Sequence, residues 1–411
     1  LNSENIFIYD FDKFITKNGE DNVFNYSQFF FGDLKISIDY LPAFGQDLMK
    51  YVIAYLGLTK KCIVLDLDNT LWGGIVGEDG FNGIKLGPEP PGNAFMEFQR
   101  VLLSLHQRGI ILAINSKNNF EDAMKVIKEH PYMILKEEHF SSMRINWNDK
   151  VNNIKEIVRE INIGSDSLVF IDDDPVNREF VKSVFPEILV VNLSDDPSSY
   201  VYEIENLIDF SVLKITDEDK NRGKMYLQQK KVIELEKTST DLQTFLNQLN
   251  LKIIIKDVDE FTLPRVSQLI LKTNQFNLTT KRYQEMDIEK MIKDSNFIVT
   301  CVQVEDKFGD NGITGVFIIK KENQKEWRID TFLMSCRIMG RDIEKGIMAY
   351  IINKAKENNI QKINADFIPT QKNKPIEKFL SDHEFKKEGE SWTYKIKSKI
   401  KFPEYLRIEV E

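Results

Sequence analysis

The segment from 61 to 74, KCIVLDLDNTLWGG, joins an apolar run directly to two carboxylates, Asp66 and Asp68. Burying an ionised carboxylate without a partner is costly, and two neighbouring carboxylates also repel each other. A chain tolerates this arrangement where a cation or a reacting phosphate lies between the acids. The segment therefore predicts a strand that ends at a binding site.

Strand-like and helix-like segments alternate between about residues 60 and 210. The predicted strands are short and rich in Val, Ile and Leu, as buried parallel strands are. Between them, apolar residues recur at spacings of three or four, as at Phe95, Phe98 and Leu102. This alternation predicts an α/β fold with a doubly wound parallel sheet, whose ligands bind at the carboxyl ends of the strands. The expected strands are 62–67, 110–115, 168–171 and 188–191.

A second α/β pattern follows a charged connector that carries no strand signal. At roughly 150 residues per domain, 411 residues predict two or three domains. Strands are expected at 251–255, 297–304, 312–319 and 327–333, and a helix at 342–356. The predicted organisation is an N-terminal segment at 1–58, a first α/β domain at 59–210, a helical connector at 211–240 and a second α/β domain at 241–411.

Composition narrows the class of protein. The net charge of −9 argues against a general nucleic-acid partner or an anionic membrane. No run approaches the ~18 to 20 apolar residues that span a bilayer, and no signal peptide is visible. The three cysteines, Cys62, Cys301 and Cys336, are far apart and odd in number, which disfavours a disulfide framework or a cysteine zinc cluster. A reducing cytoplasm fits best.

The residues at the predicted strand ends are suited to phosphate chemistry. Asp66 can attack phosphorus and form an aspartyl-phosphate, and Asp68 can give a proton to the leaving oxygen. Ser116 and Lys150 can hold the non-bridging oxygens, where charge accumulates. Acids from two strand ends complete an oxygen shell for Mg²⁺. The expected metal residues are Asp66, Asp172 and Asp173, together with Asp68 through its backbone carbonyl. Thr70, Lys117 and Asn118 follow the same strand ends and are expected to bind substrate.

This set resembles the haloacid dehalogenase superfamily, whose motifs read DxD[TV], Ser/Thr, Lys and a strand-end DD. They match here, in order, at Asp66 to Thr70, Ser116, Lys150 and Asp172-Asp173. A similar acidic run at Asp10 to Phe14 lacks the Thr or Val and the later motifs, and we expect an exposed turn there. The gaps from Thr70 to Ser116 and from Ser116 to Lys150 leave no room for a cap domain. Residues 73–92 hold seven of the twenty glycines and predict a shaped loop over the site.

The chain resembles the FkbH-like glyceryl transferases more closely, from about Leu41 to Lys395. That resemblance implies 1,3-bisphosphoglycerate as substrate, removal of phosphate, and a glyceryl thioester on the phosphopantetheine arm of an acyl carrier protein. The downstream pathway, a polyketide or a surface glycan, stays open. The family commonly has a further N-terminal domain, of which 1–58 would be a remnant. The segments that carry the resemblance are KKCIVLDLDNTLWGGIVGEDG, INSKNN, HPYMIL, VFIDDDPVNRE, TNQFNLTTKRY, FGDNGITG and MSCRIMGRDIE.

The second half resembles the general N-acetyltransferase superfamily, in which a strand leads into a loop of type R/Q-x-x-G-x-G/A that binds the pyrophosphate of coenzyme A. Here the loop reads RIMGRD, and its final Asp342 would repel a pyrophosphate, which leaves room for a carrier's phosphopantetheine arm. Cys336 precedes this loop and is predicted to be the acyl-carrying nucleophile. Arg337 and Arg341 are expected to bind substrate and, with Lys345, to form a basic docking face.

Three polar residues in TNQFNL, namely Asn274, Gln275 and Asn277, could bind substrate hydroxyls or cap a turn. The four histidines show no pairing with an acid or a serine and are expected to be structural. Two other functions remain open. A simple phosphatase with a specificity domain would not need Cys336, and a carrier-docking module with inert chemistry would not need the intact set of acids.

Overall fold

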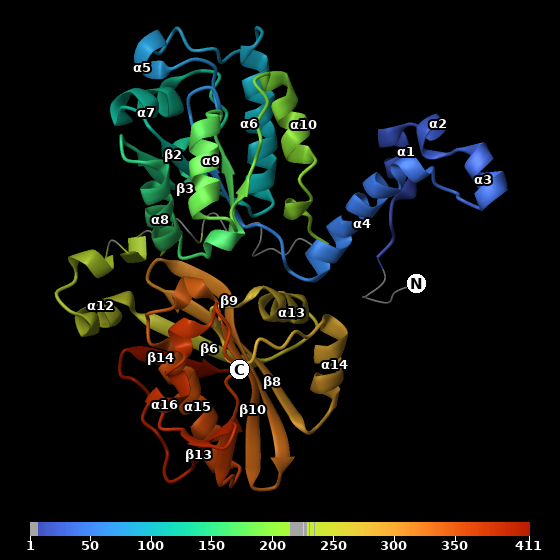
Figure 1. Ribbon diagram of the computed structural model, residues 1–411. Helices are drawn as coiled ribbons and strands as arrows, with labels where there is room; N and C mark the ends of the chain where they lie inside the picture. The colour runs from blue at the N-terminus through green and yellow to red at the C-terminus, as the bar shows by residue number, and fades with distance from the viewer. Residues whose placement is uncertain (1–6, 214–224, 226–227, 230, 234) are drawn as a thin grey trace. The chain divides into compact units, whose positions relative to one another are not determined.

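The computed structural model describes residues 7–213, 225, 228–229, 231–233 and 235–411 (Figure 1). The chain divides into two compact units: Leu1–Val158 with Gly164–Gly223, and Arg159–Ile163 with Lys224–Glu411. Most of the connector predicted at 211–240 lies outside the described residues. No helix in the described part of the chain is long and apolar enough to cross a membrane.

The first unit contains a five-stranded sheet in the order β3-β2-β1-β4-β5, and every neighbouring pair is parallel. The predicted parallel α/β class is confirmed. Four of the strands lie within two residues of their predicted bounds, and β3 is a fifth strand for which no bounds were predicted. The strands are β1 (Cys62–Leu65), β2 (Ile111–Ser116), β3 (Phe140–Ile145), β4 (Leu168–Ile171) and β5 (Leu189–Val190).

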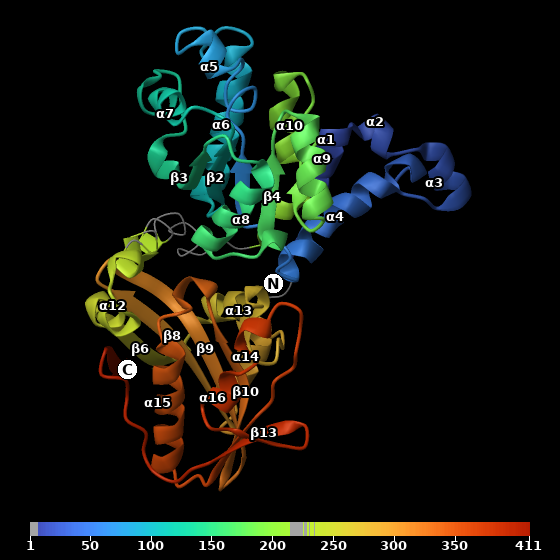
Figure 2. The ribbon, with the colours of Figure 1, turned by 60° about the vertical axis from the view of Figure 1, so that its left-hand side comes forward.

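Helices cover both faces of this sheet (Figures 1 and 2). Ile63 and Leu65 of β1 belong to a core cluster that includes side chains of three of these helices, α6, α7 and α10. The crossover back from β3 to β4 places the next two helices, α8 and α9, on the opposite face. Strands buried on both faces explain the continuous apolar runs. The helices are α6 (Gly92–Gln107), α7 (Phe120–Glu129), α8 (Lys150–Ile161), α9 (Pro175–Val184) and α10 (Tyr200–Glu205).

The glycine-rich segment after β1 is a closed loop with one short helix, α5 (Val76–Asp79). Gly73 and Lys85 exchange two backbone hydrogen bonds, with N···O distances of 3.0 and 2.7 Å. A Cβ at Gly92 would lie 2.7 Å from the Gly87 nitrogen, so a glycine is required there. The loop therefore has a fixed shape and, as expected, no cap domain stands between β1 and α6, a stretch that is described throughout.

The N-terminal segment contains α1 (Phe11–Asn18), α2 (Glu20–Val23), α3 (Tyr26–Gly32) and α4 (Leu41–Tyr55). Asp10 caps α1 by accepting a hydrogen bond from the Lys13 amide at 2.9 Å. The acidic run at Asp10 to Asp12 is therefore a helix start rather than the exposed turn that we expected. Capping, and not catalysis, accounts for the acid at its head.

The second unit contains a nine-stranded mixed sheet in the order β12-β13-β11-β10-β9-β8-β6-β14, with β7 paired to β10. The four predicted strands correspond to β6, β8, β9 and β10, each longer than predicted. The others were not predicted because they are short or, like β12, exposed. The bounds are β6 (Leu251–Asp257), β7 (Phe276–Asn277), β8 (Phe297–Asp306), β9 (Gly309–Asn323), β10 (Glu326–Met334), β11 (Lys362–Ala365), β12 (Lys386–Glu388), β13 (Ser391–Lys395) and β14 (Leu406–Val410).

Two apolar clusters line the two faces of this sheet. One contains side chains of α12, α15 and α16, and the other contains side chains of α13 and α14. The predicted helix at 342–356 corresponds to α15. The bounds are α12 (Leu242–Leu249), α13 (Leu263–Lys272), α14 (Glu285–Lys293), α15 (Ile343–Glu357) and α16 (Phe379–Asp382).

Strand β10 changes partners halfway along its length. Its first half pairs in parallel with β11 up to Ile329, and its last residues, Leu333 and Met334, pair with β7. Leu278 extends this bridge: its amide donates to Phe332 O at 3.1 Å and its carbonyl accepts from the Ile368 amide at 2.8 Å. The TNQFNL segment thus fills the space where β10 and the chain after β11 diverge.

The packing of α15 on β6 and β14 can be tested at Gly346. A Cβ there would lie 2.8 Å from Leu406 Cδ1 and 3.2 Å from Ile253 Cδ1. Gly346→Val is therefore expected to lower the free energy of unfolding by about 1–3 kcal/mol. The control is Gly45→Ala in α4, where an added Cβ meets nothing within 4 Å, and a gain of about 0.5–1 kcal/mol is expected. Denaturant unfolding measures both; a Gly346→Val chain as stable as the wild type would contradict the packing.

Candidate active site

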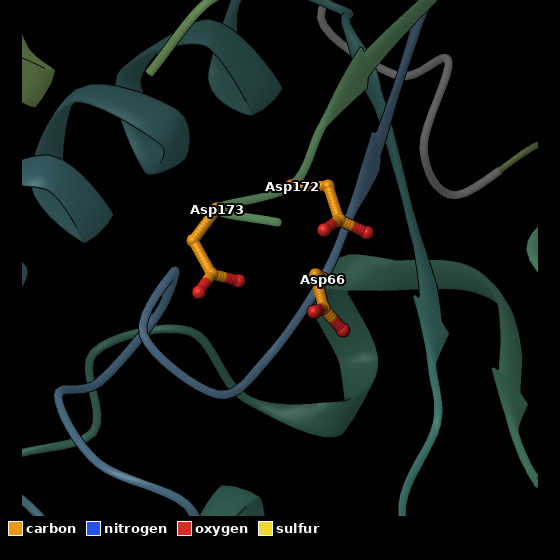
Figure 3. Close-up of side chains that lie close together, drawn as sticks. All are labelled: Asp66, Asp172 and Asp173. Atoms are coloured by element: carbon orange, nitrogen blue, oxygen red, sulfur yellow. The ribbon is translucent and has the colours of Figure 1, made fainter. Parts of the chain in front are cut away.

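Three aspartates gather at the carboxyl edge of the parallel sheet (Figure 3). Asp66 follows β1, and Asp172 and Asp173 follow the neighbouring β4. The Asp66 amide continues the sheet by donating to Ile171 O at 2.9 Å. Each aspartate offers a carboxylate oxygen, and these oxygens lie within 4.8 Å of one another. The group can therefore share one metal ion.

Lys150, the first residue of α8, lies buried beside these acids. Its Nζ is 2.8 Å from Asp66 Oδ1 and 3.0 Å from Asp172 Oδ2, and it donates to Asn115 O at 2.6 Å. Burial alone would lower the pKa of Lys150, but the charges of Asp66 and Asp172 outweigh burial and raise it. Its three N–H groups all have protein acceptors, so the expected contact of Lys150 with a substrate phosphate stays a prediction.

The carboxylates outnumber the buried cation. Three ionised aspartates and one ammonium carry a formal charge of −2, which a divalent cation would neutralise. Burial, followed by the charge of Asp66, raises the pKa of Asp172 and raises that of Asp173 to about 6. The oxygen-only donor set is the kind that Mg²⁺ prefers. The residues present therefore fit Mg²⁺, with Asp66, Asp172 and Asp173 offering side-chain oxygens.

Asp68 lies apart from this group, and its carboxylate has other partners. Oδ1 accepts hydrogen bonds from Trp72 Nε1 at 2.8 Å and from the Val76 amide at 3.1 Å, and Oδ2 accepts one from Asn118 Nδ2 at 2.8 Å. Burial raises the pKa of Asp68 although these donors favour its ionised form. The Asp68 carboxylate is not among the clustered oxygens, and the expected metal contact of Asp68, through its backbone carbonyl, stays a prediction.

The predicted substrate residues lie in different environments. Ser116 ends β2 with a side chain that is 1% exposed, and Thr70 is fully buried with no partner for its hydroxyl among the described residues. Lys117 is exposed. Asn118 is buried and donates a hydrogen bond to Asp68, so in this structure its side-chain amide contacts a protein group. Lys117 is thus the one of the four whose side chain points to solvent.

Sequence reasoning missed several residues that shape the site. Arg178 Nη1 donates to the carbonyls of Asp172 and Asp173 at 2.9 and 2.7 Å and so fixes the turn after β4. Asn115 Nδ2 donates to Lys150 O at 2.9 Å, which ties β2 to the start of α8. Asn115 is a polar residue inside an apolar strand, a signal that could have been used. Nothing local in the sequence marks Arg178.

In the second unit, Cys336 begins a short 3-10 turn directly after β10 and is partly buried. The other two cysteines are buried inside strands, where burial raises the pKa of both thiols, that of Cys301 to about 11. Among the three cysteines, all of them in the described residues, Cys336 is thus the one with access to solvent. This position agrees with the expected nucleophile without testing it.

The two arginines after Cys336 turn inward. Arg341 is 3% exposed, pairs with Asp306 Oδ2 at 2.8 Å and donates to Arg337 O at 3.1 Å. Arg337 is 7% exposed and its guanidinium contacts Met225 Sδ. The predicted basic docking face is therefore wrong for these two residues, because their charges are enclosed by the unit. Lys345 alone is exposed, and it pairs with Asp342 at 2.6 Å.

The polar residues of TNQFNL hold the β7 segment in place. Asn277 is fully buried; its Oδ1 accepts from the Thr280 amide at 2.9 Å and its Nδ2 donates to Thr273 O at 3.2 Å. Of the two expected roles, the structure gives Asn277 the turn cap. Asn274 accepts a hydrogen bond from Arg282. Gln275 is partly exposed, and its expected substrate contact stays a prediction.

No protein-family model and no curated protein matches the chain. The N-terminal part of the protein BF1531 from Bacteroides fragilis, described as containing a phosphatase domain complexed with Mg, is 37% identical over 51% of this chain, with a TM-score of 0.49. The match covers 56% of that structure, so the chain spans little more than half its length.

Solved N-acetyltransferases also resemble the chain. The ribosomal-protein-S18-alanine N-acetyltransferase from Escherichia coli is 8% identical over 36% of this chain and 95% of its own, with a TM-score of 0.29. The spermidine N-acetyltransferase SpeG N152L mutant from Vibrio cholerae is 12% identical over 35% of this chain and 93% of its own, with a TM-score of 0.28. The similar structures thus include a phosphatase domain and N-acetyltransferases, while the FkbH-like specificity stays a prediction.

The metal fit can be tested through stability. The pKa of Asp173 is about 6 when folded and 3.8 ordinarily, so the folded chain loses stability as pH rises between these values and the carboxylate ionises. Mg²⁺ binds the ionised group and stabilises by mass action, about 2.7 kcal/mol at 100 times Kd. Thermal melts should therefore show a larger Mg²⁺-induced rise in Tm near pH 7.5 than near pH 5. Asp173→Asn should reduce both the rise and its pH dependence; an equal rise at both pH values would contradict the site.

Proposed function

We propose that the first unit is a Mg²⁺-dependent phosphatase in which Asp66 is the nucleophile. The observation that carries the proposal is the buried cluster of Asp66, Asp172, Asp173 and Lys150 at the carboxyl edge of a parallel sheet. Ligands of such sheets bind at that edge. An excess of buried negative charge beside a fixed carboxylate suits the binding of a cation together with a phosphate group.

Asp66 is oriented for attack on phosphorus. Lys150 lies against Oδ1, which leaves Oδ2 to form the bond to phosphorus as the bond to the leaving oxygen breaks. The leaving oxygen takes a proton from Asp68. A water then attacks the aspartyl-phosphate, Asp68 accepts its proton, and phosphate leaves with Asp66 restored. When bound, Mg²⁺ supplies positive charge that offsets the charge of the phosphoryl group.

The finer proposal follows the family resemblance. The substrate is 1,3-bisphosphoglycerate, and the glyceryl group passes to the thiol of an acyl carrier protein through Cys336. Acyl transfer needs a centre other than Asp66, since an aspartate that attacks phosphorus does not hold an acyl group. The Cys336 thiolate attacks the acyl carbonyl and releases the C1 phosphate, and the Asp66 site removes the C3 phosphate by hydrolysis. The carrier thiol then displaces Cys336 from the thioester. The solvent access of Cys336, in contrast to Cys62 and Cys301, supports this choice of thiol.

Two other functions make different predictions. A phosphatase with a specificity domain would keep full activity without Cys336. An inert docking module would release no phosphate, and the complete set of Asp66, Asp68, Ser116, Lys150 and Asp173 argues against it, because an inert copy has no need for these buried charges.

Asp66→Asn should abolish phosphate release, by at least about 10³-fold, because it removes the nucleophile. The fold should survive, since the change is isosteric and relieves repulsion among the acids. Phosphate release from p-nitrophenyl phosphate measures the effect. The control is Asp122→Asn on the exposed face of α7, which should leave the rate unchanged. An Asp66→Asn chain that releases phosphate at the wild-type rate would exclude this nucleophile.

Cys336→Ala should lose loading of a carrier protein from 1,3-bisphosphoglycerate while it retains phosphate release from p-nitrophenyl phosphate. Peptide mass spectrometry after an acid quench should find the glyceryl adduct on Cys336 of the wild type. Cys301→Ala is the control, because that thiol lies inside β8. Full carrier loading by Cys336→Ala, or an adduct on Cys62 or Cys301, would refute the relay and favour the simple phosphatase.

A further inference from the structure

The Asp68 carboxylate is held by donors from two different strand ends. Trp72 and the Val76 amide belong to the loop after β1, and Asn118 belongs to the turn after β2. Trp72 has no exposed side-chain surface, which fixes its indole by packing. A carboxylate otherwise rotates over a broad range about its last torsion. The three donors therefore define the plane of the carboxylate.

The two carboxylate oxygens of Asp68 differ in their remaining capacity to accept hydrogen bonds. Oδ1 accepts two hydrogen bonds, from an indole and a backbone amide, and neither donor can accept one in return. Oδ2 accepts one hydrogen bond, from Asn118. Oδ2 thus keeps a lone pair that can carry a proton to or from a substrate oxygen, and the direction of that lone pair depends on Asn118.

The amide of Asn118 can present its nitrogen to Asp68 in one orientation only. Its Oδ1 accepts a hydrogen bond from the Asn119 amide at 2.9 Å, so its Nδ2 must face Oδ2 of Asp68. The side chain is 4% exposed and cannot move freely into solvent. Ser116, the last residue of β2, lies two residues before Asn118, so the predicted phosphate contact and the partner of the proton donor are close in the chain.

We propose that Asn118 is a positioning residue, which aims Oδ2 of Asp68 at the leaving oxygen, rather than a residue that binds substrate. The inference rests on the proposed phosphatase function. Its chemistry is a proton transfer: the proton on Oδ2 moves to the leaving oxygen as the P–O bond breaks, and Oδ2 later recovers a proton from the attacking water.

The test uses the full chain with Mg²⁺ and two phosphate esters, p-nitrophenyl phosphate and benzyl phosphate. p-Nitrophenolate leaves without a proton, whereas benzyl alcohol requires one. A positioned acid contributes about 10²–10⁴-fold. Asn118→Ala should therefore lower kcat on benzyl phosphate by about 10- to 100-fold, change kcat on p-nitrophenyl phosphate by less than about 3-fold, and leave KM unchanged on both.

Two further variants separate positioning from packing. Asn118→Asp keeps the size of the side chain but replaces the donor with a carboxylate that repels Asp68, so it should be at least as impaired as Asn118→Ala on benzyl phosphate. Asn119→Ala, at the neighbouring exposed side chain, should behave as the wild type. In an Asp68→Ala background, Asn118→Ala should add no further loss, since the two residues act as one unit.

Several results would overturn the inference. An equal loss on both esters would mean a structural role, and a raised KM with unchanged kcat would mean substrate binding. Additive losses in the double variant would mean that Asn118 acts without Asp68. If the wild-type chain releases no phosphate from either ester or from 1,3-bisphosphoglycerate, the proposed function is refuted and the inference with it. This outcome differs from the other three, which leave the proposed function intact.

Discussion

The buried ammonium of Lys150 is the interaction on which the active-site edge depends. It contacts acceptors from three adjacent strands: Asp66 after β1, Asn115 in β2 and Asp172 after β4. A buried charge is tolerated when its partners are well placed and its hydrogen bonds are all made, and a lysine has three N–H groups to satisfy. The ammonium thereby fixes the three strand ends relative to one another, and the rest of the site is built around that point.

The same interaction leaves the site short of positive charge. The single charge of Lys150 cannot neutralise three carboxylates. Asp173 belongs to the cluster but is not one of the three acceptors of the ammonium, and its pKa rises to about 6. The carboxylates of the cluster repel one another, and a bound divalent cation would reduce this repulsion. Metal binding, the protonation of Asp173 and the stability of the first unit are therefore one linked equilibrium.

The sequence was enough to predict local features of the fold and the site. It was not enough to predict features that depend on contacts between residues far apart in the chain. Short apolar runs followed by polar residues located β1, β2 and β4 and placed Asp66, Ser116 and Asp172 at one edge, because parallel strands share the direction of their carboxyl ends. The sequence could not show that Arg341 pairs with Asp306, 35 positions earlier, and so the predicted basic face was wrong. It equally could not show that Asn118 holds the Asp68 carboxylate, since Asn118 comes from another strand end.

The glycine-rich loop has two roles that cannot vary independently. It joins β1 to α6 without a cap domain, and the residues at its start supply both donors, Trp72 and the Val76 amide, that hold Oδ1 of Asp68. Internal hydrogen bonds keep its shape, among them Gly74 N to Asn69 Oδ1 and Ile75 N to Asp79 Oδ2, each at 2.8 Å. Because these bonds fix the loop, they also fix both donors to Oδ1, while Asn118 orients Oδ2 from a different strand end. A substitution that alters the shape of the loop is therefore expected to alter the orientation of the Asp68 carboxylate as well.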